Sequence, residues 1–269
     1  MIDQDLALWN KAADEYNAAI IRGDFFREKL LDIVLLQLLG KIHNKKVLDA
    51  GCGQGYFSHI LYKAGAHVVG VDGSRNLIKL AKQNYEENES LKFLEHNLKT
   101  KLPFQDQAFD IILCNMVLMD FDPIDATLHE FARVLRPQGI FIFSVLHPLF
   151  STGFLHKTIW ERITHALPHY AISRYKTPFN SSRCVAGIKK STTYYHRPIS
   201  FYTNALDMYG FLIKKVEEPT FETQIVDKTN NFLRLCAEIP PFFIVKTVKD
   251  SSLTHSTSFS VNPEHGRMD

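Results

Sequence analysis

The stretch Val47-Leu-Asp-Ala-Gly-Cys-Gly-Gln-Gly55 decides how the rest of the chain is interpreted. A short apolar strand runs directly into three glycines, and residues 56–64 then follow a helical pattern. Glycines between a strand and a helix permit a tight turn, and they also let the backbone approach a ligand closely. Open α/β sheets bind ligands at the carboxyl ends of their strands. We therefore expect a ligand at Gly51, Gly53 and Gly55.

Strands and helices alternate after this loop. Short apolar strands are expected at residues 67–71, 91–95, 110–114 and 140–145, and helices are expected at 76–84 and 125–135. This alternation is typical of a parallel sheet with helices on both faces. We predict an α/β fold in which residues 46–148 form the ligand-binding core.

The segments outside this core have different patterns. Residues 1–45 are mainly helical up to Gly40, and residues 149–198 have no clear period. Residues 199–249 return to the core pattern, with a helix at 200–208 and strands at 211–216 and 241–248. Residues 250–269 are polar, so we expect a disordered tail.

The composition excludes several protein classes. With 269 residues, 45% of them hydrophobic, the chain can bury a large core, which argues against a disordered protein. No apolar run approaches the roughly 18 residues that span a membrane, and the acidic N-terminus is unlike a signal peptide. The four cysteines form no CxxC pair. We therefore predict reduced thiols, no metal site and a cytoplasmic protein.

An acidic residue, Asp72, ends the second expected strand about 20 residues after the glycine loop. A carboxylate at this place can accept hydrogen bonds from both hydroxyls of a ribose, which predicts a nucleoside cofactor. The dinucleotide fingerprint G-x-G-x-x-G/A requires a small last residue, and Tyr56 occupies that position. The loop therefore disfavours a nicotinamide dehydrogenase.

With Asp49 two residues before the first glycine, the loop resembles motif I of the class I S-adenosylmethionine-dependent methyltransferases. Later segments resemble further motifs of that family in the same order: residues 68–74, 96–104, 109–115 and 133–139, and a closing segment from 196 to 219. The resemblance implies a Rossmann-like fold, with a mainly parallel seven-stranded sheet and helices on both faces.

The resemblance also implies the cofactor, S-adenosyl-L-methionine, and its product, S-adenosyl-L-homocysteine. Asn97 stands where the family often has aspartate, but its carbonyl can still accept a hydrogen bond from adenine. Residues 1–45 would form a lid, with Trp9 near Tyr16. The implied cofactor-binding residues are Asp49, Gly51, Gly53, Gly55, Asp72, Gly73, Ser74, Asn97, Leu98, Asn115 and Tyr16.

Catalysis by methyl transfer needs little beyond alignment and exclusion of water, because a sulfonium methyl is already electrophilic. If the acceptor must lose a proton, a general base must lie within hydrogen-bonding distance of it. The candidates are His147, which follows the fifth strand, and Tyr195 and His196. For each histidine a purely structural role is an equal alternative.

Residues 149–198 are basic and aromatic. Between residues 150 and 200 eight lysines or arginines are opposed by one glutamate, Glu161. Positive charge interleaved with aromatic side chains suits an anionic partner. The alternative is a folded substrate cap whose aromatic residues form its own core.

The predicted function is methylation of a small molecule, an anionic one among the candidates, at O, N or C. One alternative is a tRNA base methyltransferase, in which the basic segment contacts phosphates. An alternative of another class is a regulatory protein that binds S-adenosylmethionine without catalysis. We predict no membrane partner, and the sequence leaves the oligomeric state open.

Overall fold

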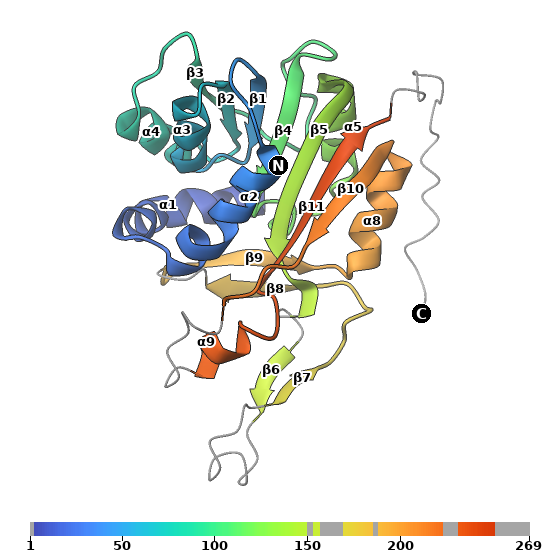
Figure 1. Cartoon of the computed structure of the whole chain (residues 1–269). Helices are drawn as coiled ribbons and strands as arrows, with labels where there is room; N and C mark the ends of the chain where they lie inside the picture. Colours follow the sequence, from blue (N-terminus) through green and yellow to red (C-terminus); the bar gives the residue numbers. More distant parts are fainter. Residues whose placement is uncertain (1–2, 150–152, 157–168, 185–187, 223–230, 251–269) are drawn as a thin grey trace.

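The computed structural model describes residues 3–149, 153–156, 169–184, 188–222 and 231–250. Its centre is a seven-stranded sheet with the strand order β10-β11-β5-β4-β1-β2-β3 (Figure 1). Strand β11 runs antiparallel to both of its neighbours, and the other pairs are parallel. The strands are β1 (Lys46–Ala50), β2 (His67–Asp72), β3 (Leu91–Glu95), β4 (Phe109–Asn115), β5 (Leu135–Leu146), β10 (Phe211–Glu217) and β11 (Phe242–Lys249).

The central strands carry long apolar runs because both sheet faces are covered. Strand β4 reads Ile-Ile-Leu-Cys at residues 111–114, and all four side chains are buried. One face packs against α2 (Asp32–Leu39), α3 (Tyr56–Lys63) and α4 (Arg75–Asn84). The other face packs against α5 (Asp125–Val134) and α8 (Ile199–Met208). The predicted α/β fold with helices on both faces is confirmed.

The helical N-terminus is confirmed but interrupted. Helix α1 (Gln4–Arg22) is capped by the Asp3 carboxylate and ends at Gly23, whose φ is 96°. A π-helical turn η1 (Arg27–Leu31) then leads into α2, which ends at Gly40. The break after α1 separates a helix at the pocket from a helix in the core. Helix α1 lies against the pocket described below, whereas α2 buries Leu35 and Leu38 against the sheet.

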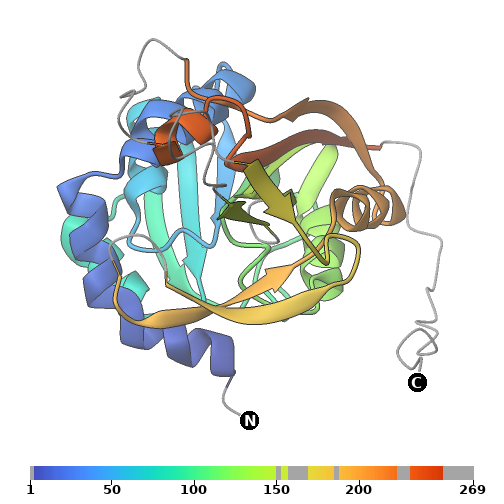
Figure 2. The same ribbon diagram turned by 90° about the horizontal axis from the view of Figure 1, so that it is seen from below.

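The segment after β5 contains two hairpins that the sequence did not predict. They are β6 (Gly153–His156) with β7 (His169–Ile172), and β8 (Phe179–Cys184) with β9 (Ser191–His196). Figure 2, seen from below, shows β9 running along α1 beneath the sheet. The backbone N–H groups of Lys189 and Lys190 donate to the Glu15 carboxylate of α1. The short helix α9 (Asn231–Leu235) precedes β11. The predicted tail, apart from Asp250, lies outside the described residues.

Candidate active site

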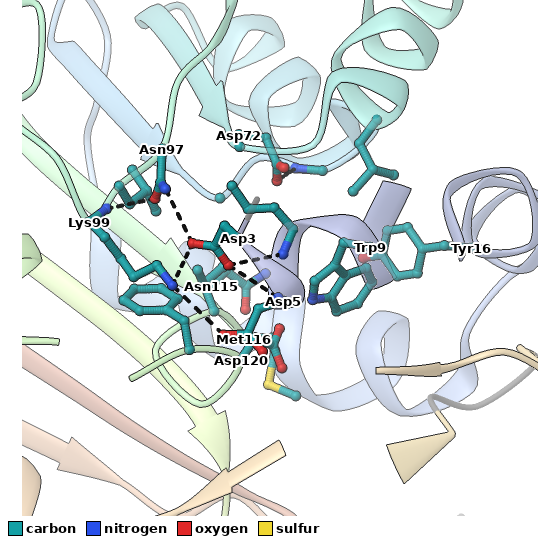
Figure 3. A pocket seen from close by; sticks show the side chains of 18 residues that line it. Asp3, Asp5, Trp9, Tyr16, Asp72, Asn97, Lys99, Asn115, Met116 and Asp120 are labelled. Carbon is teal, nitrogen blue, oxygen red and sulfur yellow. Dashed lines mark hydrogen bonds and ion pairs between the residues drawn. The ribbon is translucent and has the colours of Figure 1, made fainter. Parts of the chain in front are cut away.

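A pocket lies at the carboxyl ends of β1, β2 and β4, under helix α1 (Figure 3). The glycine loop and the loops after β2, β3 and β4 form its wall, and α1 closes it. The structure brings together eight of the predicted cofactor-binding residues: Tyr16, Gly51, Gly53, Asp72, Gly73, Asn97, Leu98 and Asn115.

Asp72 organises the glycine loop. Its Oδ2 accepts the Gly53 N–H at 2.9 Å, and its Oδ1 accepts the Ser74 N–H at 2.8 Å. Burial raises the pKa of Asp72 to about 6, against the opposing effect of these two N–H donors. Gly51 needs to be glycine, because its φ is +80° and a Cβ atom there would lie 2.3 Å from Val117 Cγ2. The glycine loop and Val117, which follows β4, are therefore packed closely together in the wall of the pocket.

Asp49 lines an adjoining hollow on the other side of Gly51. Its Oδ2 accepts the Ser58 hydroxyl at 2.6 Å, and burial raises its pKa to about 6. Arg27 of η1 lines the same hollow. Its side chain packs over the Tyr56 ring, 3.8 Å from the centroid, but its Nε and Nη2 are buried without a hydrogen-bond partner among the described residues. An acid and an unsatisfied guanidinium thus face one hollow.

Two predicted cofactor contacts serve the protein itself. Gly55 is not among the described residues that line the pocket, and a Cβ atom there would meet the Phe93 ring at 2.9 Å. Ser74 caps α4 by accepting the Leu77 N–H, and its hydroxyl donates to Asn10 of α1. We infer packing and capping roles for these residues.

His147 directly follows β5 and is buried, but it is not among the described residues that line the pocket. Its Nδ1 accepts the Leu149 N–H at 3.2 Å, so Nε2 carries the ring hydrogen and donates to Glu218 Oε1 at 2.7 Å. Both ring nitrogens are therefore engaged in holding the chain after β5 against the loop after β10. This geometry favours the structural alternative over the base.

The first test concerns this histidine. Replacing His147 with alanine removes both hydrogen bonds from a buried site, which should lower the free energy of unfolding by about 1–3 kcal/mol. Binding of S-adenosylhomocysteine, measured by calorimetry, should change less than about twofold because His147 lies outside the pocket. His129→Ala is the control, since that imidazole is 68% exposed. A large loss of affinity without a loss of stability would contradict the structural role and place His147 in the cofactor site.

Tyr195 and His196, the other two base candidates, are not among the described lining residues either. His196 Nε2 donates to the Tyr175 carbonyl at 2.7 Å, its ring stacks on Phe179, and burial lowers its pKa. The Tyr195 hydroxyl donates to the Asp5 carboxylate at 3.2 Å. Burial, and then that carboxylate, raise the pKa of Tyr195 to about 12. Their roles as bases remain predictions that this geometry does not favour.

The acidic start of α1 is a part of the site that sequence analysis missed. Asp3 forms an ion pair with Lys99 at 2.5 Å and accepts a hydrogen bond from the Asn97 amide at 3.3 Å. Asp5 lies 3.8 Å from Lys99. These contacts fasten the start of α1 to the loop after β3 (Figure 3). The sequence signal is an aspartate at the N-cap of the helix and a second in its first turn, which ordinarily indicates only a helix start.

Asp120, in the loop after β4, was also missed. It lines the pocket, is 8% exposed, and pairs with Arg183 of β8 at 3.3 Å. Burial raises its pKa to about 7, while Arg183 lowers it. In the sequence it is one acid among several after an apolar strand, and its partner is 63 residues away.

The aromatic and basic residues of the insertion are partly structural. Tyr194 belongs to the core, and Arg197 is buried, donating to the carbonyls of Leu118 and Phe121. Trp160, Lys157, Arg162 and the side chain of Tyr170 lie outside the described residues. The described part therefore favours a folded cap over an open nucleic-acid surface.

Within the described ranges, the His, Cys, Asp and Glu side chains form no group that could hold a metal ion. No helix in this part of the chain is long and apolar enough to cross a bilayer.

Comparison with known proteins identifies the domain. Residues 48–143 match the family model described as "Methyltransferase domain". These residues carry β1 and the glycine loop through most of β5. Residues 48–143 belong to the class I S-adenosylmethionine-dependent methyltransferase family. The resemblance seen in the sequence is thereby confirmed.

Similar proteins extend beyond this domain. An S-adenosylmethionine-dependent methyltransferase structure from Mesorhizobium loti is 23% identical with a TM-score of 0.67, covering 81% of this chain and 96% of that one. It supports the methyltransferase fold outside residues 48–143. A malonyl-[acyl-carrier protein] O-methyltransferase of Hamiltonella defensa is 38% identical over 120 residues, 44% of this chain and 45% of that protein.

A demethylmenaquinone methyltransferase of Tropheryma whipplei is 28% identical over 142 residues, 52% of this chain and 59% of that protein. The chain therefore matches about half the length of these curated relatives. The two relatives are named for different acceptors, so the likeness in the methyltransferase domain does not select a substrate.

Proposed function

We propose that the protein transfers the methyl group of S-adenosyl-L-methionine to a small molecule bound between the pocket and the β8–β9 hairpin. The observation that carries the proposal is the position of Asp72, which lines the pocket at the end of β2 and accepts the Gly53 N–H of the glycine loop. A carboxylate at this carboxyl edge of a parallel sheet is suited to the hydroxyls of a nucleoside. The family of residues 48–143 supports this cofactor.

The two charged ends of the adjoining hollow fit the amino acid part of the cofactor. Asp49 would lie near the ammonium group, and the unsatisfied guanidinium of Arg27 would bind the carboxylate. Asp72 would accept the ribose hydroxyls, while Gly73, Asn97 and Leu98 would border the adenine. The protein's contribution would be orientation and exclusion of water, with α1 as the lid.

The covering of the pocket by helix α1 supports a small molecule as the substrate. Helix α1 closes the pocket, and hydrogen bonds from Lys189, Lys190 and Tyr195 of the β8–β9 hairpin hold that helix in place. A tRNA base would need a broad basic approach to the pocket. Arg183 and Arg197, two cations of the insertion, instead turn toward Asp120 and Asp122.

We also propose a reducing compartment such as the cytoplasm. The four cysteines are free, and three of them, Cys52, Cys114 and Cys236, are buried. Chains in oxidising compartments usually pair their cysteines.

A second test concerns the ribose contact. Asp72→Ala should weaken binding of S-adenosylhomocysteine by about 1–3 kcal/mol, which is the usual cost of losing a well-placed partner of buried polar groups. Calorimetry measures the affinity, and thermal unfolding checks that the protein remains folded. Asp207→Ala, an exposed aspartate on α8, is the matched control. Unchanged affinity in the Asp72 variant would mean that the nucleoside does not bind in this pocket.

Turnover separates the three functions. The protein and S-adenosylmethionine would be incubated in separate reactions with the small-molecule, the RNA and the protein fraction of a cell extract. We expect S-adenosylhomocysteine to form only with the small-molecule fraction, at a rate that changes little with salt. Formation with RNA, falling steeply as salt rises, would favour the tRNA methyltransferase. Cofactor binding without turnover on any fraction would favour the regulatory protein.

A further inference from the structure

Asp120 is the carboxylate of the pocket with the fewest partners. Asp72 accepts two backbone N–H groups, and Asp3 and Asp5 are engaged by Lys99 and Tyr195. Asp120 accepts one long hydrogen bond, 3.3 Å from Arg183 Nη2 to its Oδ1. Its Oδ2 receives no hydrogen bond from the residues that the structure describes. A buried carboxylate with a free oxygen requires a further donor.

Asp120 lies between the pocket and strand β8, so the missing hydrogen-bond donor belongs at that place. Its own N–H donates to the Val117 carbonyl at 2.8 Å, which fixes it at the end of the loop after β4. Figure 3 shows Asp120 beside Met116 and Asp5, away from Asp72. Arg183 approaches from β8 in the cap, so Asp120 lies where the described cap meets the pocket.

Arg183 only partly satisfies this carboxylate. Its Nη1 lies 3.7 Å from Met119 Sδ, and its Nε is buried without a partner among the described residues. A guanidinium in a bidentate pair with a carboxylate would make two short bonds. Because this pairing is loose, the Asp120 carboxylate can accept a further hydrogen bond from a group in the pocket.

We propose that Asp120 is the carboxylate that faces the transferred methyl group and its acceptor, so that the acceptor is a hydroxyl or an amine rather than an anion. This inference rests on the proposed function and names its substrate class. Asp120 would accept a hydrogen bond from the nucleophile's O–H or N–H group. An anionic acceptor would instead meet a like charge in a buried site.

The reaction step balances in atoms and charge. A lone pair of the acceptor oxygen or nitrogen forms the new bond to the methyl carbon. The sulfur–carbon bond breaks, and its electron pair remains on sulfur. The acceptor's proton passes to Asp120. The positive charge on sulfur and the negative charge on Asp120 disappear together, which favours the transfer in a site of low polarity.

The charge of Asp120 is set by its surroundings on several elements. Burial raises its pKa to about 7, Arg183 on β8 lowers it, and Asp72 and Asp5 raise it. Neutral groups near it are Tyr16 on α1, Cys114 on β4 and Tyr202 on α8. A group with a pKa near neutrality can both hold and release a proton under working conditions.

The test uses ligands that differ at the methyl position. Sinefungin carries a protonated amine where S-adenosylmethionine carries its methyl group, and S-adenosylhomocysteine carries nothing there. The ratio of their affinities, measured by calorimetry, reports a carboxylate at this position. Asp120→Asn should lower the sinefungin preference by about 10- to 100-fold, the range for one charge-assisted hydrogen bond. Its affinity for S-adenosylhomocysteine should stay within about threefold, and Asp207→Asn should leave both affinities unchanged.

An unchanged ratio in Asp120→Asn, with S-adenosylhomocysteine still bound, would overturn the inference. If the wild-type protein bound none of these ligands, the proposed function would fail instead. If Asp120→Asn did not fold, the wild-type ratio would decide: it should fall as the pH is lowered from about 8 to about 5.5, because Asp120 becomes neutral below its pKa. A ratio that stays flat over this range would contradict the inference.

Discussion

Gly51→Ala should abolish cofactor binding and destabilise the protein. The new methyl group would lie 2.3 Å from Val117 Cγ2 and 3.0 Å from its Cβ, so Val117 and the loop after β4 would have to move. The positive φ of 80° adds strain of about 1–2 kcal/mol for a residue with a Cβ atom. Overpacking at a filled site adds about 1–3 kcal/mol. Both effects act on the wall of the pocket.

The control for this substitution is Gly40→Ala. Gly40 also has a positive φ, 66°, but no atom lies within 4 Å of the added methyl group. Both variants place a Cβ atom at a positive φ, and only Gly51→Ala adds the clash. Thermal unfolding should show a larger loss of stability for Gly51→Ala, and calorimetry should show a loss of S-adenosylhomocysteine binding of at least about tenfold in that variant alone. Equal behaviour of the two variants would contradict a close approach at Gly51.

Arg27→Met should weaken binding of both adenosyl cofactors by about 10- to 100-fold. The guanidinium is buried, its Nε lies 4.0 Å from Asp32 Oδ2, and two of its nitrogens have no hydrogen-bond partner among the described residues. A charge-assisted hydrogen bond to a carboxylate contributes about 1.5–3 kcal/mol, which corresponds to that range of affinity. Calorimetry with S-adenosylmethionine and S-adenosylhomocysteine measures it.

Specificity for the carboxylate provides the internal control. 5′-Methylthioadenosine has the adenosine and sulfur but lacks the amino acid, so its affinity should change less than about threefold in Arg27→Met. Arg22→Met, at the exposed end of α1, should affect none of the ligands. An equal loss for methylthioadenosine would mean that Arg27 maintains the fold near Tyr56 and Asp32 rather than binding the cofactor.

The fold and many of the residues that line the pocket could be predicted because their signals are local. Apolar strands such as residues 110–114, a glycine loop and Asp72 at a strand end each lie within a few residues, and parallel topology then brings them to one edge. The same reasoning placed Asn97 and Asn115, which also follow strands. Gly55 shows the limit of this reasoning, because a glycine in the loop can allow close packing against aromatic rings, here Phe93 and Tyr85, instead of contact with a ligand.

The acceptor side could not be predicted because its residues come together only in the folded chain. Arg183 meets Asp120 across 63 residues, and Tyr195 meets Asp5 across 190. Strand β8, Phe-Asn-Ser-Ser-Arg-Cys, is mostly polar and exposed, so its sequence carries little hydrophobic pattern by which its pairing with β9 could be predicted. His147 was a reasonable candidate because it follows β5, but its ring donates to Glu218 and it is not among the described residues that line the pocket.

The central claim is that this pocket holds an adenosyl cofactor of methyl transfer. Calorimetric titration of the purified wild-type protein with S-adenosylmethionine, S-adenosylhomocysteine and NADH tests it most directly. We expect saturable binding of both adenosyl ligands, one per chain, and no heat from NADH, because Tyr56 stands where a dinucleotide needs a small residue. Binding of NADH, or of neither adenosyl ligand, would contradict it.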